Sequence, residues 1–407
     1  MYRGISELKG LIIDIDSFRD VNITDWEEIN QKYKCLFIVV NEEQKKAFQE
    51  QYGEDKVYML EPYYKLFAPS QITHKKAIDD MELNATEVAY VSRDKMFLDN
   101  AMSFLGGTVW VTDEVTYNNM GKAPDLSCRG FKTFKNYILQ DVKGFLGEVV
   151  IYPSQETRGV IIPMMFETDE GSYPLYMLGR YFNHHHYMSQ LHPYSSAVYL
   201  NKKEERKAFG KFNDIFSKLY SSAIKRIQLS NQIDGIVPVP VRPGRKERFK
   251  TILDFVCESC GIEDLSEDFK CVKDYPTQKN LDAVERQKNI AGVFQYDGNL
   301  QGKNIVLIDD IVTTGATIRE CISVLKARGA EKIFIVVLAV NQMSHPYWSA
   351  DVAQVTCGKC GEKMHLLINS YNREFFYSCY GCHSTKSFEQ GRMELCELVN
   401  SEMRQML

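Results

Sequence analysis

One stretch, Val306–Thr317, constrains this chain more than any other. It belongs to an apolar run, Asn304–Ile308, whose β-branched residues and leucine predict a strand buried on both faces of a parallel sheet. Two adjacent carboxylates, Asp309 and Asp310, follow where such a strand would end, and a small-residue loop then leads into a helical pattern. The sequence therefore predicts an α/β fold with a polar site at the carboxyl edge of a sheet.

The loop after the acidic pair has the chemistry of a phosphate cradle. Hydroxyls and free backbone amides come just before a helix N-terminus, whose dipole favours an anion. The carboxylates cannot face that phosphate unaided, and they suit ribose hydroxyls or a Mg2+ that bridges sugar and pyrophosphate. Each part alone is also typical of an ordinary turn or helix cap, but together they predict a sugar-phosphate site. The residues of the loop are Thr313, Thr314, Gly315, Ala316 and Thr317.

Composition narrows the class of protein. A chain of 407 residues predicts two to four domains, and a net charge of -5 supplies no global basic field for nucleic acid. We expect a cytoplasmic protein without a membrane partner, because no apolar run approaches the length of a membrane span and the first residues lack the layout of a signal peptide. Eleven cysteines, four of them in Cys-x-x-Cys pairs, favour metal-bound or free thiols over disulfides.

Residues 1–120 predict a parallel α/β domain with carboxylates at its strand ends. Asp14 and Asp16 end the first predicted strand, and Asp94 and Asp99 follow the third. Such carboxylates could hold Mg2+ and present Asp14 to a phosphate as a nucleophile, although solvated strand ends are the simpler alternative. The four predicted strands are Leu8–Ile15, Cys35–Val40, Glu87–Val91 and Thr108–Thr112.

This arrangement resembles the haloacid dehalogenase superfamily, whose first motif is Asp-x-Asp. The resemblance implies that Asp14 is the nucleophile and Asp16 the general acid/base, with Asp94 and Asp99 as the magnesium pair. It also implies that Lys75 or Lys76 faces the phosphate.

The chain departs from the pattern of that superfamily. Asn41 stands where a serine or threonine is usual, and Arg93 replaces the usual glycine. The short interval between Asp16 and Asn41 leaves no room for a typical cap domain. An uncapped site would favour a bulky phosphorylated substrate.

Four basic residues in seven follow another predicted strand, Asp234–Val241. They lie in Arg242-Pro-Gly-Arg-Lys-Glu-Arg248, a density of positive charge that suits pyrophosphate, although a solvated basic turn is the alternative. Two further motifs come next, Pro276-Thr-Gln-Lys-Asn-Leu281 and Glu285-Arg286-x2-Asn289-x4-Phe294.

In this order the motifs resemble the ComF family of type I phosphoribosyltransferases, over roughly residues 234–350. The resemblance implies Mg2+-dependent transfer between phosphoribosyl pyrophosphate and a nitrogenous base, or the reverse. Asp309 and Asp310 would bind the ribose hydroxyls, and Thr313–Thr317 the 5-phosphate. Dimers are frequent among such proteins, so a homodimer is a candidate assembly. The remaining implied contacts are Arg242, Arg245 and Lys246 to pyrophosphate, and Thr277, Gln278 and Arg286 in a segment that closes over the site.

Two Cys-x-x-Cys turns near the end of the chain give the strongest metal signal. Their spacing predicts a tetrahedral thiolate site, with free cysteines as the alternative. The four ligands would be Cys357, Cys360, Cys379 and Cys382. Four sulfurs leave no open position, so we expect a structural zinc.

These patterns divide the chain into two parallel-sheet α/β domains and a small zinc ribbon. The predicted divisions are 1–120 (haloacid dehalogenase-like), 121–172 (connecting region), 173–350 (phosphoribosyltransferase), 351–385 (ribbon) and 386–407 (helix). In the connecting region we expect a helix over Phe131–Leu146 and strands over Glu148–Tyr152 and Gly159–Met165.

The predicted function is a phosphoribosyltransferase, with a candidate phosphatase step on its nucleotide product in the N-terminal domain. One alternative is a ComF-type regulatory or nucleic-acid-binding protein that keeps the phosphoribosyl site as a sensor. Another is an N-terminal phosphatase with a regulatory nucleotide-binding domain. The sequence does not specify the acceptor base. In the first alternative the ribbon would bind single-stranded DNA through Lys359, Lys363, Arg373, Tyr371, Phe375 and Tyr377.

Overall fold

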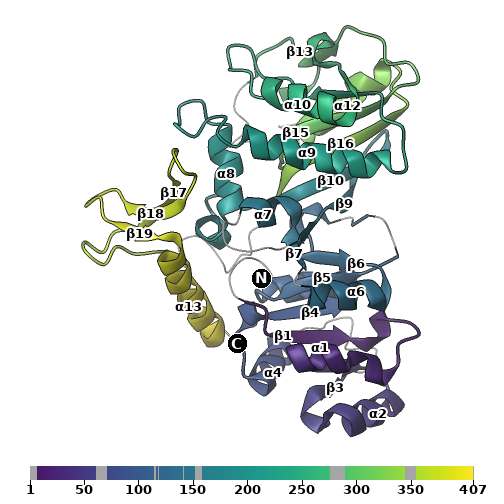
Figure 1. The fold of residues 1–407 in the computed structure, drawn as a ribbon, viewed down its shortest axis with the longest axis vertical. Coiled ribbons are helices and arrows are strands. Elements are labelled where there is room, and N and C mark those ends of the chain that lie inside the picture. The colour runs from purple at the N-terminus through teal and green to yellow at the C-terminus, as the bar shows by residue number, and fades with distance from the viewer. Residues whose placement is uncertain are drawn as a thin grey trace.

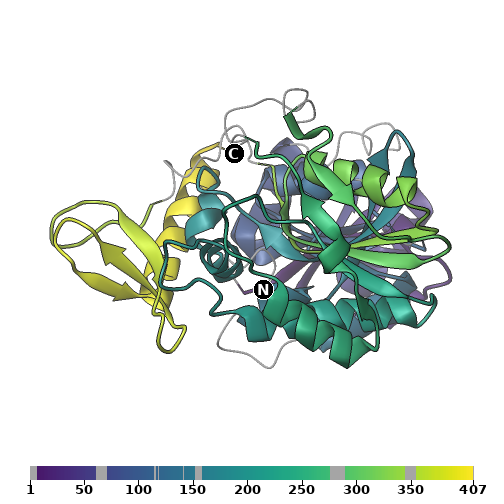
Figure 2. The same ribbon diagram turned by 90° about the horizontal axis from the view of Figure 1, so that it is seen from above.

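A computed structural model describes residues 7–60, 71–113, 116–117, 119–140, 142–151, 158–275, 289–343 and 354–406. Two parallel-sheet α/β domains lie one above the other, and a small β-ribbon projects to one side (Figures 1 and 2). The α/β class predicted from the sequence is confirmed.

The N-terminal domain is built on a parallel sheet with the strand order β3-β2-β1-β4-β5-β6. The order reverses at β1, so the carboxyl end of β1 lies at a topological switch point, where open α/β sheets commonly bind ligands. The strands are β1 (Gly10–Asp14), β2 (Lys34–Val39), β3 (Val57–Met59), β4 (Val88–Ser92), β5 (Gly107–Val111) and β6 (Leu126–Cys128). Its helices are α1 (Glu27–Lys32), α2 (Glu42–Tyr52), α4 (Gln71–Met81), α5 (Lys95–Ser103) and α6 (Gly130–Leu139).

Alternate residues of the N-terminal strands enter two different cores. On β1, Leu11 and Ile13 pack on one face of the sheet, and Ile12 packs on the other. The sheet continues beyond residue 120, because β6 pairs with β5. This last strand has only three residues, too few for a hydrophobic pattern to reveal it.

The second domain is built on a sheet with the order β12-β11-β15-β16-β10-β9, in which only the β9–β10 pair is antiparallel. It begins at β9, before residue 173. The strands are β9 (Ile162–Thr168), β10 (Gly171–Tyr181), β11 (Gly235–Pro238), β12 (Glu263–Asp264), β15 (Asn304–Val312) and β16 (Lys332–Asn341). The helices are α8 (Pro193–Asn201), α9 (Asn213–Gln228), α10 (Lys250–Cys260) and α12 (Ala316–Ala327), and a separate hairpin pairs β13 (Phe269–Cys271) with β14 (Phe294–Tyr296).

The connecting region differs in part from the prediction. A helix, α6, does form there, but it ends at Leu139, and β7 (Val142–Phe145) and β8 (Arg158–Val160) form a small parallel pair. The strand expected over Glu148–Tyr152 is instead a helix, α7 (Leu146–Ile151), and that prediction is wrong. Glu148 lies in its first turn, where the helix dipole favours an acidic side chain, and it is held there by Arg180.

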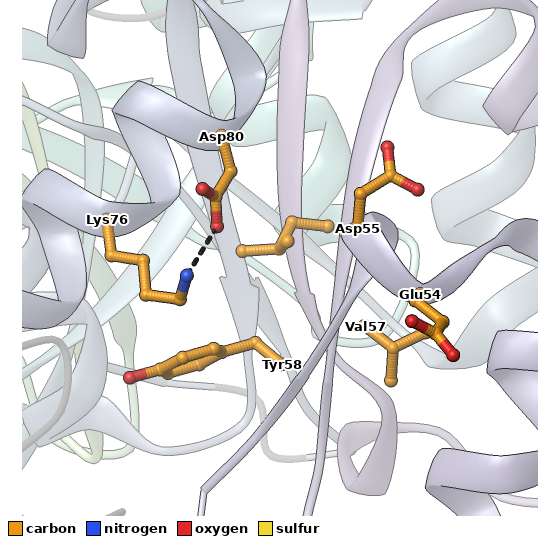
Figure 3. Close-up of a pocket in the computed structure, with 7 residues that line it drawn as sticks. Glu54, Asp55, Val57, Tyr58, Lys76 and Asp80 are labelled. Carbon is orange, nitrogen blue, oxygen red and sulfur yellow. Dashed lines mark ion pairs between the residues drawn. The ribbon is translucent and has the colours of Figure 1, made fainter.

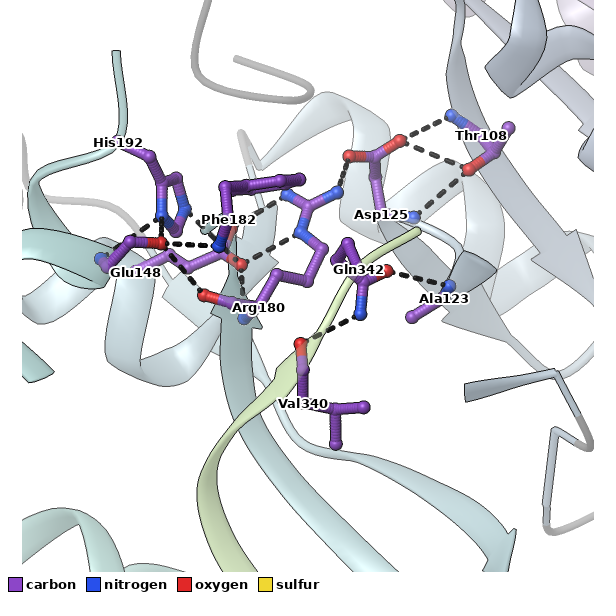
Figure 4. Close-up of polar contacts among 10 residues, drawn as sticks. Thr108, Ala123, Asp125, Glu148, Arg180, Phe182, His192, Val340 and Gln342 are labelled. Carbon is purple, nitrogen blue, oxygen red and sulfur yellow. Dashed lines mark hydrogen bonds and ion pairs between the residues drawn. The ribbon is translucent and has the colours of Figure 1, made fainter. Parts of the chain in front are cut away.

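A buried ion network joins the two domains (Figure 4). Arg180 on β10 is only 2% exposed and pairs with Asp125 and, at 2.8 Å, with Glu148. Asp125 in turn accepts hydrogen bonds from the backbone and hydroxyl of Thr108 on β5, at 2.8 and 3.1 Å. Burial alone would raise the pKa of Glu148, but the charge and hydrogen bonds of Arg180 lower it. The domains therefore share a polar interior as well as an apolar one.

The ribbon and the last helix link the two domains a second time. The ribbon contains β17 (Met364–Ile368), β18 (Phe375–Cys379) and β19 (Thr385–Ser387), and its Leu366 amide donates to the side chain of Gln190 at 3.0 Å. Helix α13 (Phe388–Met406) runs from the ribbon to the N-terminal domain (Figure 1), where Thr86 donates to Asn400 at 2.9 Å. Within the described ranges, no helix is both long and apolar enough to cross a membrane.

Candidate functional site

The acidic pair lies inside a strand rather than after it. Strand β15 continues to Val312, so Asp309 and Asp310 remain in the sheet, with Asp309 in register with Val337 of β16. Their side chains are 13% and 6% exposed. Such burial of two neighbouring carboxylates requires compensating charge.

That charge comes from Arg248. Its Nε lies 2.6 Å from Oδ2 of Asp310, and its Nη2 lies 3.6 Å from Oδ1 of Asp309. Arg248 belongs to the basic run recognised in the sequence, but its partners are 61 and 62 residues away along the chain. Only the basic run itself could have drawn attention to this residue, and nothing in that run identifies its partners.

The acidic pair also shapes the electrostatics around it. Burial and the neighbouring charge of Asp310 raise the pKa of Asp309 to about 6, and Arg248 opposes this shift. Lys202, at the end of α8, is partly buried; burial lowers its pKa, while Asp310 and Asp309 act in the other direction. Tyr220 on α9 donates its hydroxyl to the backbone oxygen of Asp309 at 2.8 Å. Sequence reasoning missed both Lys202 and Tyr220, because neither belongs to a recognised motif.

The predicted phosphate loop runs from β15 into α12. Gly315, the N-cap of α12, has a φ of 78°, in the left-handed region that favours glycine. A Cβ at this position would lie 2.5 Å from the buried ring of Phe166 on β9, so the loop needs glycine for space as well. Thr313 is exposed, and Thr314 and Thr317 are partly exposed. The loop thus offers hydroxyls beside the acidic pair, and it leads into the N-terminus of α12, a helix of twelve residues.

The other predicted pyrophosphate contacts lie on the loop between β11 and α10. Arg242 donates to the backbone oxygen of Tyr275 at 2.9 Å, and its guanidinium lies over the ring of that tyrosine. Arg245 and Lys246 are exposed, and the Lys246 amide donates to Glu204 at 3.0 Å. The last three predicted contacts, Thr277, Gln278 and Arg286, lie outside the described residues.

The carboxylates predicted to act in the N-terminal domain have separate local partners. Asp14 is buried at the end of β1 and accepts hydrogen bonds from the hydroxyls of Ser17 and Ser92, at 2.9 and 2.8 Å. Asp16 is exposed and accepts from Gln44 at 3.2 Å.

The expected magnesium pair follows the same pattern. Asp94 caps α5 by accepting from the amides of Met96 and Phe97. Asp99 accepts from Tyr117 at 3.1 Å and from Asn119 at 2.8 Å. The structure does not gather these two carboxylates with Asp14 and Asp16 into a group whose oxygens could share one ion.

Lys76, one of the two lysines expected near the phosphate, is paired within its own helix. Its Nζ is 3.0 Å from Asp80 on the same helix, α4 (Figure 3). The two line a pocket of about 230 Å³ on the β3 side of the sheet. The other lining residues are Leu36, Glu54, Asp55, Val57 and Tyr58.

The four predicted zinc ligands do converge. The sulfurs of Cys357, Cys360, Cys379 and Cys382 all lie within 4.8 Å of one another. Across the described ranges this is the one group of three or more metal-ligating side chains that comes together in this way. Four thiolates around a single point are the donor set of a structural zinc site, so the residues present fit that metal.

The ribbon exposes fewer aromatic residues than the sequence suggested. Phe375 and Tyr377 are buried, and both rings contact Phe388 of α13. Tyr371 is 98% exposed, whereas Tyr380 is 56% exposed and stacks on His365. The cation of Arg373 is paired with Asp214 of α9. The exposed aromatic residues of the ribbon are therefore Tyr371 and Tyr380.

Comparisons with known proteins agree with the geometry of the second domain. Residues 259–359 match the model of the phosphoribosyl transferase domain. The DNA utilization protein YhgH of Salmonella typhi is 34% identical over 107 residues, which cover 25% of this chain and 46% of that protein. Competence protein F of Haemophilus influenzae is 27% identical over 128 residues, covering 29% and 56%.

A third relative carries the name of an enzyme. The ribose-phosphate pyrophosphokinase of Ralstonia nicotianae is 33% identical over 73 residues, covering 18% of this chain and 21% of that protein. The chain thus spans about half the length, or less, of these curated relatives. The matched family domain contains Asp309, Asp310 and the loop that follows them. Together the comparisons support a ComF-like domain of the type I phosphoribosyltransferase class in this part of the chain.

Proposed function

We propose that this protein is a phosphoribosyltransferase that acts on phosphoribosyl pyrophosphate and a nitrogenous base, or in the reverse direction. The observation that carries the proposal is the order along β15 and α12: a buried acidic pair, then a hydroxyl-bearing loop with a left-handed glycine, then a helix N-terminus. This order would place hydrogen-bond acceptors at a sugar and donors at its phosphate.

The residues of the site suit the chemistry of pyrophosphate displacement. Pyrophosphate leaves readily once cations neutralise it, and Mg2+ would supply part of that charge when bound. The protein would supply the rest of the positive charge from the loop after β11, through Arg242, Arg245 and Lys246. The remaining work is to position the sugar and to stabilise positive charge at its anomeric carbon, for which the buried carboxylates are suited. No nucleophilic side chain is needed.

The test is isothermal titration of phosphoribosyl pyrophosphate with Mg2+ into the zinc-loaded protein and an Asp309→Asn/Asp310→Asn variant. We expect binding to the wild type and a loss of about 100-fold or more in the variant, because two charged acceptors are removed. Asp297→Asn, at an exposed carboxylate paired with Lys270, is the matched control. A folded wild type that does not bind would refute the proposal. Binding would justify a screen of bases for pyrophosphate release.

A second candidate function is a ComF-type role with single-stranded DNA. It draws on the names of two relatives, a DNA utilization protein and a competence protein, and on the exposed rings of Tyr371 and Tyr380. Exposed aromatic rings can stack on bases, with Lys359 and Lys363 nearby in the sequence for phosphates. A Tyr371→Ala/Tyr380→Ala variant should bind single-stranded DNA more weakly than the wild type, with a similar salt dependence. Equal binding of single-stranded DNA by the variant and the wild type would exclude these two ribbon tyrosines as the DNA-binding site.

A phosphatase step in the N-terminal domain is a further proposal. It is supported by the position of Asp14 at the switch point of the sheet. Asp14→Asn should abolish release of phosphate from the nucleotide product. Unchanged release would remove this step from the proposed function. Phosphatase activity that survives Asp309→Asn and Asp310→Asn would instead favour a phosphatase with a regulatory nucleotide site.

A further inference from the structure

One guanidinium bridges the two carboxylates of the candidate site. Arg248 uses Nε for Oδ2 of Asp310, at 2.6 Å, and turns Nη2 toward Oδ1 of Asp309, at 3.6 Å. The amide of Asp310 also donates to Oδ1 of Asp309, at 2.8 Å. One oxygen of each carboxylate is therefore occupied by the protein itself.

The other oxygen of each carboxylate is available. In the described part of the chain, Oδ2 of Asp309 and Oδ1 of Asp310 accept no hydrogen bond. Two adjacent acceptors in fixed orientations suit the two neighbouring hydroxyls of a ribose, each of which donates one hydrogen bond. The orientation of both acceptors depends on the guanidinium that holds the opposite oxygens.

Arg248 is anchored differently from the other basic residues of its loop. Its own amide and that of Phe249 both donate to the side chain of Glu247, at 2.8 and 2.7 Å. The ring of Phe249 is fully buried, and the guanidinium of Arg248 lies over it. These contacts hold the start of α10 and aim Arg248 at the acidic pair.

We infer that Arg248 is a positioning residue that orients Asp309 and Asp310 for the ribose hydroxyls of a sugar phosphate, rather than a ligand of the pyrophosphate. The inference rests on the proposed function. It separates Arg248 from Arg242, Arg245 and Lys246, which belong to the same loop. It also predicts that a substitution of Arg248 weakens binding of the sugar and leaves binding of the pyrophosphate unchanged.

Three titrants distinguish these roles: phosphoribosyl pyrophosphate, ribose 5-phosphate and pyrophosphate, each with Mg2+. For Arg248→Gln we expect affinity for the two ribose-containing ligands to fall by about tenfold or more, with pyrophosphate binding unchanged. Arg248→Lys should recover only part of the loss, because an ammonium keeps the charge but cannot form the fork. Lys250→Gln, an equal change of charge at an exposed position two residues away, should bind all three ligands like the wild type.

Three results would overturn the inference while leaving the proposed function intact. Weaker binding of phosphoribosyl pyrophosphate with unchanged ribose 5-phosphate binding would assign Arg248 to the pyrophosphate. An equal loss for all three ligands would assign it a general structural role. A wild type that binds phosphoribosyl pyrophosphate but not ribose 5-phosphate would count against it as well. If the glutamine variant does not fold, the lysine variant carries the same comparison. A wild type that binds none of the ligands would instead refute the proposed function itself.

Discussion

Both α/β domains place buried carboxylates at or near the carboxyl end of a central strand, yet they compensate them differently. In the N-terminal domain Asp14 accepts hydrogen bonds from the hydroxyls of Ser17 and Ser92. In the second domain Asp309 and Asp310 face the guanidinium of Arg248. Hydroxyls are thus among the partners of Asp14, whereas Asp309 and Asp310 share one guanidinium, as two adjacent buried carboxylates need a cation. A carboxylate at a strand end therefore indicates a binding site only when the groups around it suit a ligand.

Arg180 joins the two domains, so a change there tests whether each is stable independently of the other. Arg180→Gln would leave Asp125 and Glu148 buried without their cation, at a cost of about 3–5 kcal/mol. We expect both domains to lose stability together, in one transition during urea unfolding. Arg328→Gln, at an exposed position, should change stability by less than about 0.5 kcal/mol. Two well-separated transitions in the Arg180 variant would show that the domains unfold independently.

The hydroxyl groups that contact Asp14 can be tested at Ser92. Ser92→Ala removes a donor to Asp14 and an acceptor for the amide of Asp94, and should cost about 1–3 kcal/mol. Binding of phosphoribosyl pyrophosphate should not change, because these contacts belong to the other sheet. Ser222→Ala, at an exposed position on α9, is the matched control, with an expected change within about 0.5 kcal/mol. A loss of ligand binding in Ser92→Ala would mean that the two sites are coupled.

Acid should act in opposite directions at one titratable group in each domain. Burial lowers the pKa of His74 to about 3, from 6.5 in the unfolded chain. Below pH 6.5 the unfolded state therefore binds the proton more tightly, and the contribution of His74 to the free energy of unfolding falls by about 1.4 kcal/mol per pH unit. The effect of Asp309 on stability has the opposite sign. Its pKa is raised to about 6 in the folded protein, so the folded state binds the proton more tightly and gains stability as the pH falls.

Urea unfolding at pH 7.5 and 5.5 measures both effects. His74→Phe should remove the loss on acidification, and Asp309→Asn should remove the gain. The difference between each variant and the wild type isolates its own group from the other titrating residues. A His74 variant with the same pH dependence as the wild type would show that His74 is not held neutral in the folded protein.

Sequence reasoning succeeded where a pattern is local. The strand over Asn304–Ile308, the turn at Gly315 and the cysteine pairs are each specified by neighbouring residues. The periodicity of apolar residues likewise predicted most strands of the N-terminal sheet, within one or two residues.

It failed where a distant partner decides the structure. Glu148–Ile151 has apolar residues that allow a strand, but the segment forms α7 with Glu148 held by Arg180, 32 residues later. Arg248 looked like one basic residue among four, and only the fold brings it to Asp310. Phe375 and Tyr377 alternate as a surface strand would, yet α13 covers them. No single-sequence pattern contains these long-range contacts.

The smallest expected effect on stability concerns Asp16, and it decides most about the N-terminal domain. Asp16 is exposed and accepts from Gln44 at 3.2 Å, so Asp16→Asn should change the free energy of unfolding by less than about 0.5 kcal/mol. If Asp16 acts as a general acid/base, phosphatase activity should nevertheless fall by about 100-fold or more. Hydrolysis of a small phosphomonoester, measured beside urea unfolding, separates the two effects. Unchanged hydrolysis would exclude that role, and the N-terminal carboxylates would then differ from Asp309 and Asp310 in function as well as in their partners.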